Sequence, residues 1–367
     1  MKLFIFSLLL LRLASASFAK ADVPITDPNI LYSPYNWFKS GSAYAQTPNP
    51  GAYLKLTFSG TKLAVNVDVS PFTQANVPAS QYPLIRFSVD GGPAKTVQLT
   101  PTTSAIPCAN SVSAGNHSLL LQYVAGYVFL DFWTPVNVLR ITGFTLDDGA
   151  KLSPASEIRP ANVLFFGDSI TNGDDDVADF IHGITNAVDT QDATIGYPSV
   201  VAAGIGAEYG VVAYGGASWD GNAADGHTPG LMTSYSMIDS LHSRLTNGKL
   251  LPVPDDLYIN MGENVGPSGN DVPKLLTALR TASSRWTKIF VIIPFSGRAR
   301  LALREGYNDY KKSVPTDGRT YLIDLGNNPN LPVGRPTMMS VDGQHPLAVL
   351  HGLLGAQIVQ ARAKLLR

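Results

Sequence analysis

The sequence predicts a two-domain protein of the α/β class, in which an all-β sandwich precedes a parallel sheet packed between helices. Strand-like alternation of apolar residues marks the first half of the chain, apolar strands alternate with helical stretches in the second, and a polar stretch separates the two. A length of 367 residues suits two domains, and a hydrophobic content of 45% is enough to build a core in each.

The first domain is expected to span residues 22–148. Leucine and valine recur at every second position from Leu63 to Val69, which is the period of a half-buried strand. The sequence Asp90-Gly91-Gly92 is typical of a hairpin turn between two further strands. Because no convincing helix interrupts the strands, we expect a jelly-roll-like sandwich. The expected strands are 63–69, 84–89, 96–99, 118–124 and 138–146.

The second domain is expected to span residues 161–367, after a Gly/Pro-containing linker at 149–160. The alternation of strands and helices favours a parallel sheet with helices on both faces. Ligands of such sheets bind beyond the carboxyl ends of the strands. The expected strands are 162–166, 210–214, 256–260, 288–293 and 319–323, and the expected helices are 199–208, 272–285, 298–311 and 346–366.

Residues 1–21 have the pattern of a secretory signal peptide. Lys2 supplies the positive end, residues 3–11 form an apolar run, and small residues offer cleavage after Ala16 or after Ala21. Because the apolar run is too short to span a bilayer, we expect secretion rather than a membrane anchor.

Charge and cysteine content exclude several partners and chemistries. The chain has 27 Lys and Arg against 28 Asp and Glu, which gives no basic footprint for nucleic acid or a membrane surface. Cys108 is the single cysteine, so no intrachain disulfide can form, and we interpret it as structural. No zinc-type cluster or nucleotide-binding loop is found, so no metal or cofactor is expected.

The run Asp174-Asp175-Asp176 could bind a cation, but we interpret it as a solvated acidic loop. The sequon Asn116-His117-Ser118 is expected in a hairpin loop, where it can carry a glycan.

A candidate nucleophile follows the first strand of the second domain. The apolar residues 163–166 lead into Gly167-Asp168-Ser169. Nucleophilic catalysis needs a hydroxyl held at a strand end, where a substrate carbonyl can reach it. The alternative is that the serine or the aspartate only caps a helix. The Gly-x-Ser-x-Gly motif that is typical of α/β-hydrolases is absent from the sequence.

A candidate base lies near the C-terminus. Three of the six histidines, His182, His242 and His345, have an aspartate three residues before them, and His345, with Asp342, is the one that lies directly before the expected last helix. That spacing allows the carboxylate to orient the ring and to stabilise the imidazolium. His351 is the weaker alternative, since it is expected within the last helix.

Two further loops can stabilise an oxyanion. Gly216 follows the strand at 210–214, and a glycine allows the close backbone approach that an N–H donor needs; Gly215 could serve instead. Asn264 follows the strand at 256–260 and could donate a side-chain N–H, or it could be an ordinary turn residue. Trp219 could stack on a sugar or belong to the core.

Together, these blocks resemble those of the SGNH/GDSL hydrolase superfamily. The matching residues are Gly167-Asp168-Ser169, Gly216-Ala217-Ser218, Gly262-Glu263-Asn264 and Asp342-Gly343-Gln344-His345-Pro346. A departure is Val265, where the superfamily usually has aspartate, so the local support of that loop is expected to differ.

The resemblance implies an SGNH-type α/β/α domain with Ser169 as nucleophile, His345 as base and Asp342 as the orienting acid. The oxyanion donors would be the Ser169 and Gly216 N–H groups and the Asn264 side chain. We also expect Asp168 and Trp219 to contact the substrate.

The order of the domains resembles that of two-domain acetyl xylan esterases, in which a jelly roll precedes an SGNH domain. We therefore expect a monomeric, secreted serine esterase whose substrate is acetylated polysaccharide or oligosaccharide. The alternatives are a lipase or short-chain aryl-ester hydrolase on the same site, and a catalytically silent carbohydrate-binding protein.

Overall fold

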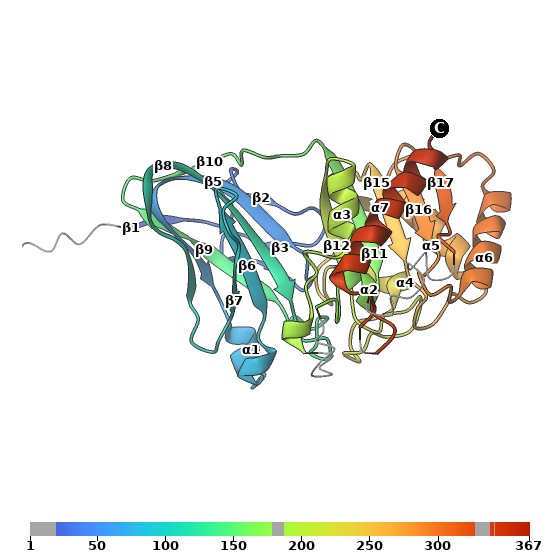
Figure 1. Cartoon of the computed structure of the whole chain (residues 1–367), viewed down its shortest axis with the longest axis horizontal. Coiled ribbons are helices and arrows are strands. Elements are labelled where there is room, and N and C mark those ends of the chain that lie inside the picture. Colours follow the sequence, from blue (N-terminus) through green and yellow to red (C-terminus); the bar gives the residue numbers. More distant parts are fainter. Residues whose placement is uncertain (1–19, 178–186, 327–337, 341) are drawn as a thin grey trace, which may run out of the picture.

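The computed structural model describes residues 20–177, 187–326, 338–340 and 342–367. Figure 1 shows two lobes side by side, one built of antiparallel strands and the other of a sheet flanked by helices. The antiparallel strands end at Ser153, and the first strand of the parallel sheet begins at Ala161. The predicted fold class is therefore confirmed.

The antiparallel lobe is one hydrogen-bonded sheet of ten strands. A short helix that the sequence did not predict, α1 (Ser70–Gln74), follows β5, with Pro71 in its first turn and Phe72 buried. The strands are β1 (Lys20–Val23), β2 (Leu31–Tyr32), β3 (Phe38–Ser40), β4 (Tyr44–Thr47), β5 (Tyr53–Val67), β6 (Leu84–Val89), β7 (Lys95–Gln98), β8 (Ala105–Ala125), β9 (Leu139–Asp147) and β10 (Leu152–Ser153).

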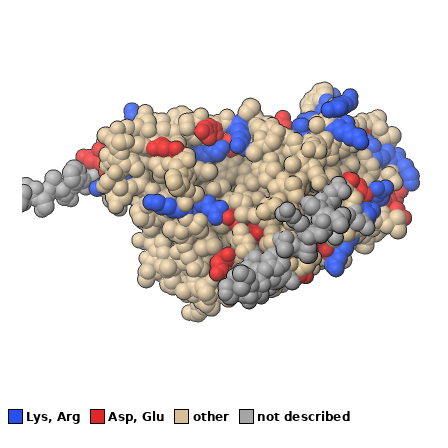
Figure 2. All heavy atoms as spheres, in the orientation of Figure 1, with Lys and Arg blue, Asp and Glu red and all other residues tan. Residues whose placement is uncertain are grey.

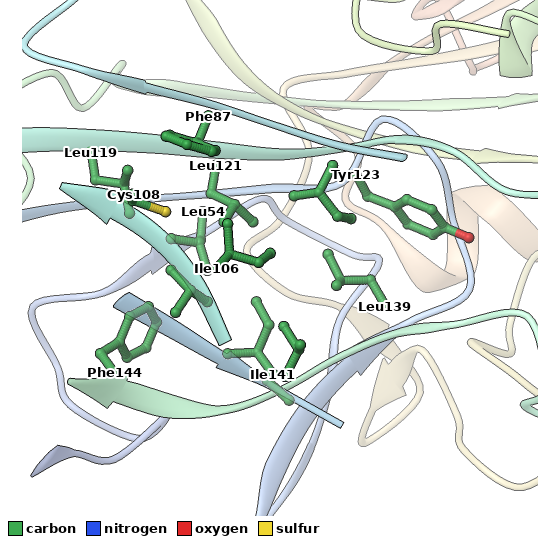
Figure 3. Close-up of a cluster of buried hydrophobic side chains, with 14 of the residues drawn as sticks. Leu54, Phe87, Ile106, Cys108, Leu119, Leu121, Tyr123, Leu139, Ile141 and Phe144 are labelled. Atoms are coloured by element: carbon green, nitrogen blue, oxygen red, sulfur yellow. The ribbon is translucent and has the colours of Figure 1, made fainter. Parts of the chain in front are cut away.

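Two long strands turn this single sheet into two layers. β5 and β8 pair along their length, but their register shifts next to Gly60. Gly60 has a φ of +108°, which residues with a side chain rarely adopt. Before the shift β5 borders β2 and β10, and after it β5 borders β9. The sheet thereby folds over a core that includes Leu54, Cys108 and Phe144 (Figure 3). Cys108 is buried there, and burial raises the pKa of its thiol to about 12, in keeping with a structural role.

The second lobe contains five parallel strands in the order β12-β11-β15-β16-β17. β11 is flanked by β12 on one side and β15 on the other, so the strand order reverses beside it. The strands are β11 (Ala161–Gly167), β12 (Ala207–Ala213), β15 (Asp256–Asn260), β16 (Lys288–Ile292) and β17 (Thr320–Ile323).

Helices cover both faces of this sheet (Figure 1). α3 (Tyr197–Gly204) and α7 (Ala348–Leu365) share one apolar cluster with the sheet, and α5 (Asp271–Ala282) and α6 (Arg300–Ser313) share another. Within the described residues, no helix combines the length and the apolar character that a membrane span requires. The helix predicted at 199–208 ends earlier, because Gly206 adopts a φ of +66° and β12 begins directly after it.

The first domain covers the β12 edge of the parallel sheet. Every residue of β12 is buried, and a Cβ at Gly210 would lie 2.1 Å from the Pro34 carbonyl oxygen. Asn36 Nδ2 donates to the Val211 carbonyl at 3.3 Å, and Lys55 pairs with the buried Glu208 at 2.7 Å. The exposed edge that an open sheet would otherwise present is thus closed by the antiparallel lobe.

Candidate active site

The candidate site lies at the carboxyl ends of three neighbouring strands. In the sheet register Gly167, the last residue of β11, pairs with Ala213 of β12 and Asn260 of β15. The loops that follow these strands therefore meet at one edge of the sheet, beside the strand where the strand order reverses. This is the position at which open α/β sheets bind their ligands.

Ser169 opens the short helix α2 (Ser169–Asn172) directly after β11. The preceding Asp168 is its N-cap, since its Oδ1 accepts a hydrogen bond from the Ile170 N–H at 3.2 Å. Capping therefore belongs to Asp168, and within the described residues no hydrogen bond engages the Ser169 hydroxyl. A Cβ at Gly167 would lie 1.9 Å from Thr171 Oγ1, so the strand can turn into α2 this tightly only with glycine there.

The side chain of Asp168 is buried, although it was predicted to contact the substrate. This side chain caps α2, and its pKa is raised to about 7 by that burial. The prediction that Asp168 contacts substrate is wrong, because the carboxylate is needed beneath the nucleophile to hold the helix start.

His345 and Asp342 form a hydrogen-bonded pair in the loop before α7. His345 Nδ1 lies 2.5 Å from Asp342 Oδ2, and Asp342 Oδ1 accepts the N–H groups of Gln344 at 2.8 Å and His345 at 3.1 Å. Burial raises the pKa of Asp342, but these hydrogen bonds outweigh it and lower that pKa to about 2. His345 Nε2 is buried and has no hydrogen-bond partner within the described part of the chain. The ring is thus oriented at Nδ1 and available at Nε2.

The two candidate histidines differ in their surroundings. Burial lowers the pKa of His345, but the bond to Asp342 and the charges of Asp174, Asp342 and Asp175 outweigh it, so the net direction is upward. His351 lies inside α7, fully buried, where its Nδ1 accepts the Tyr197 N–H at 3.2 Å. Burial lowers the pKa of His351 to about 3. This geometry gives His351 a packing role.

Gly215 and Gly216 lie in a turn that both glycines are needed to form. The Ala217 N–H donates to the Tyr214 carbonyl at 3.1 Å, and Gly216 has a φ of +72°. A Cβ at Gly215 would lie 2.0 Å from Val128 Cγ2 of the first domain. No backbone acceptor in the described residues takes the Gly216 N–H, so it is available to an oxyanion.

Asn264 is held against that glycine turn. Its Nδ2 donates to the Ala217 carbonyl at 3.0 Å, which leaves the second N–H of the amide for another acceptor. The structure thus brings Asn264 to the same edge as Gly216.

The loop of Asn264 is supported by Glu263, Ser296 and Arg298, a role that was not predicted from the sequence. Val265 is exposed, whereas Glu263 is buried and accepts a hydrogen bond from Ser296 Oγ at 2.5 Å. Arg298 donates to the Glu263 carbonyl at 2.9 Å, and its Nε lies 3.4 Å from Glu263 Oε1. The carboxylate that braces this loop therefore stands before Asn264 rather than after it. The position of Glu263 directly before Asn264 in the sequence is the feature from which this role could have been predicted.

Trp219 belongs to the core and not to the substrate surface. It is fully buried, and its Nε1 donates to the Met261 carbonyl at 3.1 Å. The prediction that Trp219 contacts substrate is wrong, because an indole can stack on a sugar only if one ring face is accessible.

The acidic run after α2 is buried, so its interpretation as a solvated loop is wrong. Asp174, Asp175 and Asp176 are 2%, 0% and 1% exposed. Asp174 accepts a hydrogen bond from Asn172 Nδ2 at 2.7 Å, and burial raises its pKa to about 7. The polar atoms of Asp175, Asp342 and His345 all lie within 4.8 Å of one another, the kind of group that can hold a metal ion. Within this group, Asp342 and His345 are joined by the hydrogen bond of 2.5 Å described above.

A pocket of about 250 Å³ lies beside the His345 loop. Its apolar wall comes from α7 and from the residues next to the candidate nucleophile, and its polar rim comes from the Glu263 and Asp342 loops. The lining residues are Ile170, Glu263, Phe295, Ser296, Arg298, Met339, Asp342, Gly343, Gln344, Pro346, Leu350 and Leu354.

Comparison with known proteins supports the fold resemblance. The chain is similar to a family two carbohydrate esterase from Cellvibrio japonicus, with a TM-score of 0.73, 15% identity and coverage of 95% of this chain and 98% of that one. A family two carbohydrate esterase from Clostridium thermocellum, solved with cellohexaose, gives 0.71 and 18% with coverage of 90% and 97%. An acetyl xylan esterase from Butyrivibrio proteoclasticus gives 0.69 and 16% with coverage of 95% and 98%. Neither the models of known protein families nor the curated proteins give a match. At these identities the likeness shows a shared two-domain fold, as the motif resemblance predicted.

Proposed function

We propose that this protein is a serine esterase that removes acetyl groups from plant cell-wall polysaccharide, such as acetylated xylan. The observation that carries the proposal is the state of His345, whose Nδ1 is bonded to Asp342 and whose buried Nε2 has no hydrogen-bond partner among the described residues, at a site where the Ser169 hydroxyl caps no helix. The fold shared with carbohydrate esterases supports the choice of substrate class.

The reaction proceeds in two acyl-transfer steps. Ser169 Oγ attacks the acetyl carbonyl carbon while His345 Nε2 takes the hydroxyl proton, and the sugar hydroxyl leaves with that proton. Water then attacks the acetyl-serine, gives its proton to His345, and acetate is released as the proton returns to Ser169. The N–H groups of Ser169 and Gly216 and the Asn264 amide stabilise the oxyanion in both steps.

The test is hydrolysis of p-nitrophenyl acetate and acetate release from a panel of acetylated polysaccharides by the full chain. Ser169→Ala should lose nearly all activity, on the order of 10⁶-fold in kcat, with an unchanged circular dichroism spectrum. Ser199→Ala is the matched control, since among the described residues its hydroxyl bonds only the carbonyl of Gly196, the N-cap of α3. A serine-directed phosphonate should label Ser169 alone. Full activity in the Ser169 variant would refute the nucleophile, and polysaccharide binding without hydrolysis would favour a silent carbohydrate-binding protein.

A second candidate, hydrolysis of longer acyl or aryl esters, is favoured by the pocket beside the His345 loop. Its walls from Ile170, Phe295 and Leu354 are apolar, and its volume of about 250 Å³ exceeds what an acetyl group fills. A series of p-nitrophenyl esters from acetate to octanoate separates the candidates. An acetyl esterase loses activity steeply with chain length, whereas a lipase gains it.

Secretion and glycosylation complete the proposal. The pattern of residues 1–21 supports export, and Asn116 of the sequon lies exposed on β8, where a glycan can be attached. β1 begins at Lys20 and pairs with β9, so cleavage after Ala16 would keep that strand whole, whereas cleavage after Ala21 would remove half of it. N-terminal sequencing of protein expressed in a secretory host tests both points.

A further inference from the structure

A second carboxylate lies beside the imidazole of His345. Asp342 Oδ2 is 2.5 Å from Nδ1, and Asp175 Oδ2 is 3.9 Å from the same nitrogen. The Asp342 side chain is 29% exposed and belongs to the loop of His345 itself, whereas the Asp175 side chain is 0% exposed and follows α2. Two acids from distant parts of the sequence, with different burial, therefore converge on one ring nitrogen.

Asp175 is fixed in this position by its own contacts. Its Oδ1 accepts a hydrogen bond from Thr190 Oγ1 at 2.8 Å, which directs Oδ2 toward the ring. The next carbonyl, that of Asp176, accepts the Ala348 N–H at 2.9 Å and so joins this loop to the start of α7, just after His345. Asp175 also has a φ of +56°, an uncommon conformation for a residue other than glycine. Such a conformation persists where the surrounding structure holds it, and it often marks a functional position.

The charges around His345 favour its protonated state. From the α2 side the ring faces Asp168, Asp174 and Asp175, from its own loop it faces Asp342, and from α7 it faces His351. The guanidinium of Arg86 is paired with Asp192 at 2.6 Å and so neutralises a more distant carboxylate. In a buried site with low dielectric response, a carboxylate at 3.9 Å attracts an imidazolium far more strongly than it would in water.

We propose that Asp175 is a second positioning residue for His345: it stabilises the imidazolium that forms during acyl transfer and accepts the Nδ1–H hydrogen bond when Asp342 is absent. A movement of about 1 Å would bring its Oδ2 within hydrogen-bond distance. This inference rests on the proposed function, since it assigns a role in the acyl-transfer cycle of the same site. It means that the site does not depend on the exposed Asp342 alone.

The test is a double-mutant cycle on the full chain with p-nitrophenyl acetate. Asp175→Asn keeps the size and the bond from Thr190, and asparagine tolerates the positive φ, so this variant removes the charge and replaces the Oδ2 acceptor with an amide N–H donor. In an enzyme with a single orienting acid, its loss costs on the order of 10⁴-fold in kcat. Here we expect Asp342→Ala to cost about 10²-fold, Asp175→Asn a few-fold, and the double variant about 10⁴-fold, which is more than the product of the two.

A pH profile separates positioning from mere structural support. Removing the Asp175 charge should lower the pKa of His345, and the acid limb of kcat/KM should move to lower pH in Asp175→Asn. Asp176→Asn is the matched control, because that buried neighbour bonds the Asp192 N–H at 2.8 Å and does not face the ring. It should leave the acid limb in place.

Thr190 gives an independent variant that keeps every charge. Thr190→Val removes the hydroxyl that orients Asp175, so it should lower the activity of Asp342→Ala a further several-fold, whereas Thr190→Ser should not. The inference is overturned if Asp342→Ala alone costs the full 10⁴-fold, or if Asp175→Asn leaves the acid limb unmoved. Activity surviving in Ser169→Ala would instead refute the proposed nucleophile, whatever Asp175 does.

Discussion

Two buried polar regions of this molecule are built from similar residues but have opposite tasks. At the candidate site, the ring of His345 is buried and its Nε2 has no hydrogen-bond partner among the described residues. Along the seam between the domains, the buried Arg244 and Glu208 are engaged by backbone and side-chain partners of the other domain. A buried polar group that makes all its hydrogen bonds stabilises the fold. One that keeps a donor or acceptor without a partner can take part in a reaction.

If the comparison is right, changes at the seam should affect folding, and changes at the site should affect only turnover. The largest effect is expected from removing the first domain altogether. A chain beginning at Ala155 would expose β12, whose residues are all buried, together with the apolar surface beside it. We expect it to aggregate, because an uncovered strand edge pairs with other chains.

Size-exclusion chromatography of the truncated chain beside the full one provides the measurement. A soluble, folded fragment that is active on p-nitrophenyl acetate but not on acetylated xylan would mean that the first domain binds polysaccharide instead. Val128, which packs on Gly215, shows that the first domain also reaches the oxyanion turn.

The next effect belongs to the site. Asn264→Ala should lower kcat on p-nitrophenyl acetate by about 10²- to 10³-fold, since it removes one proposed oxyanion donor. The melting temperature should change little, because within the described part of the chain the side chain makes one hydrogen bond, to the Ala217 carbonyl. Asn270→Ala, at an exposed position of the same loop, is the control and should retain wild-type turnover. A drop confined to KM would mean that Asn264 binds substrate rather than the transition state.

A change at the seam should lower the free energy of unfolding by about as much as Asn264→Ala lowers the stabilisation of the transition state. Arg244 is buried and donates to the carbonyls of Tyr35, Tyr235 and Met237. Arg244→Met leaves these acceptors unsatisfied, and we expect a loss of about 3 kcal/mol in unfolding free energy with kcat unchanged in the folded fraction.

Urea denaturation measures this loss, and Arg304→Met, which breaks an exposed ion pair with Asp324, should cost less than about 1 kcal/mol. Equal losses in the two variants would contradict the distinction between a buried seam and an ordinary surface.

The contrast also explains what could be predicted from the sequence. Ser169, Asp342 and His345 could be proposed from the sequence because strand ends and short loops place them by local spacing, and the strands of both domains follow from apolar periodicity. Asp175 and Trp219 were misjudged because their burial depends on packing against segments far away in the chain, such as Thr190 and Met261. An acidic run gives no sign of whether distant residues will cover it.

The smallest effect separates the two regions by pH rather than by mutation. The pKa of His345 is raised above its ordinary value of 6.5, so turnover should fall about tenfold per pH unit once the pH drops below that raised value. A group whose folded-state pKa is raised contributes stability that is fully present below its unfolded pKa and is lost as pH rises through the folded value. Protonating His345 therefore does not unfold the protein.

The stability that Asp342 contributes, with its pKa lowered to about 2, is lost only as pH falls from about 4 toward that value. We expect activity to fall over the pH window below the raised pKa of His345 while the melting temperature holds, measured by initial rates and differential scanning fluorimetry in the same buffers. Activity and melting temperature falling together across that window would mean that the acid loss reports unfolding, and that the charged groups of the site also hold the fold.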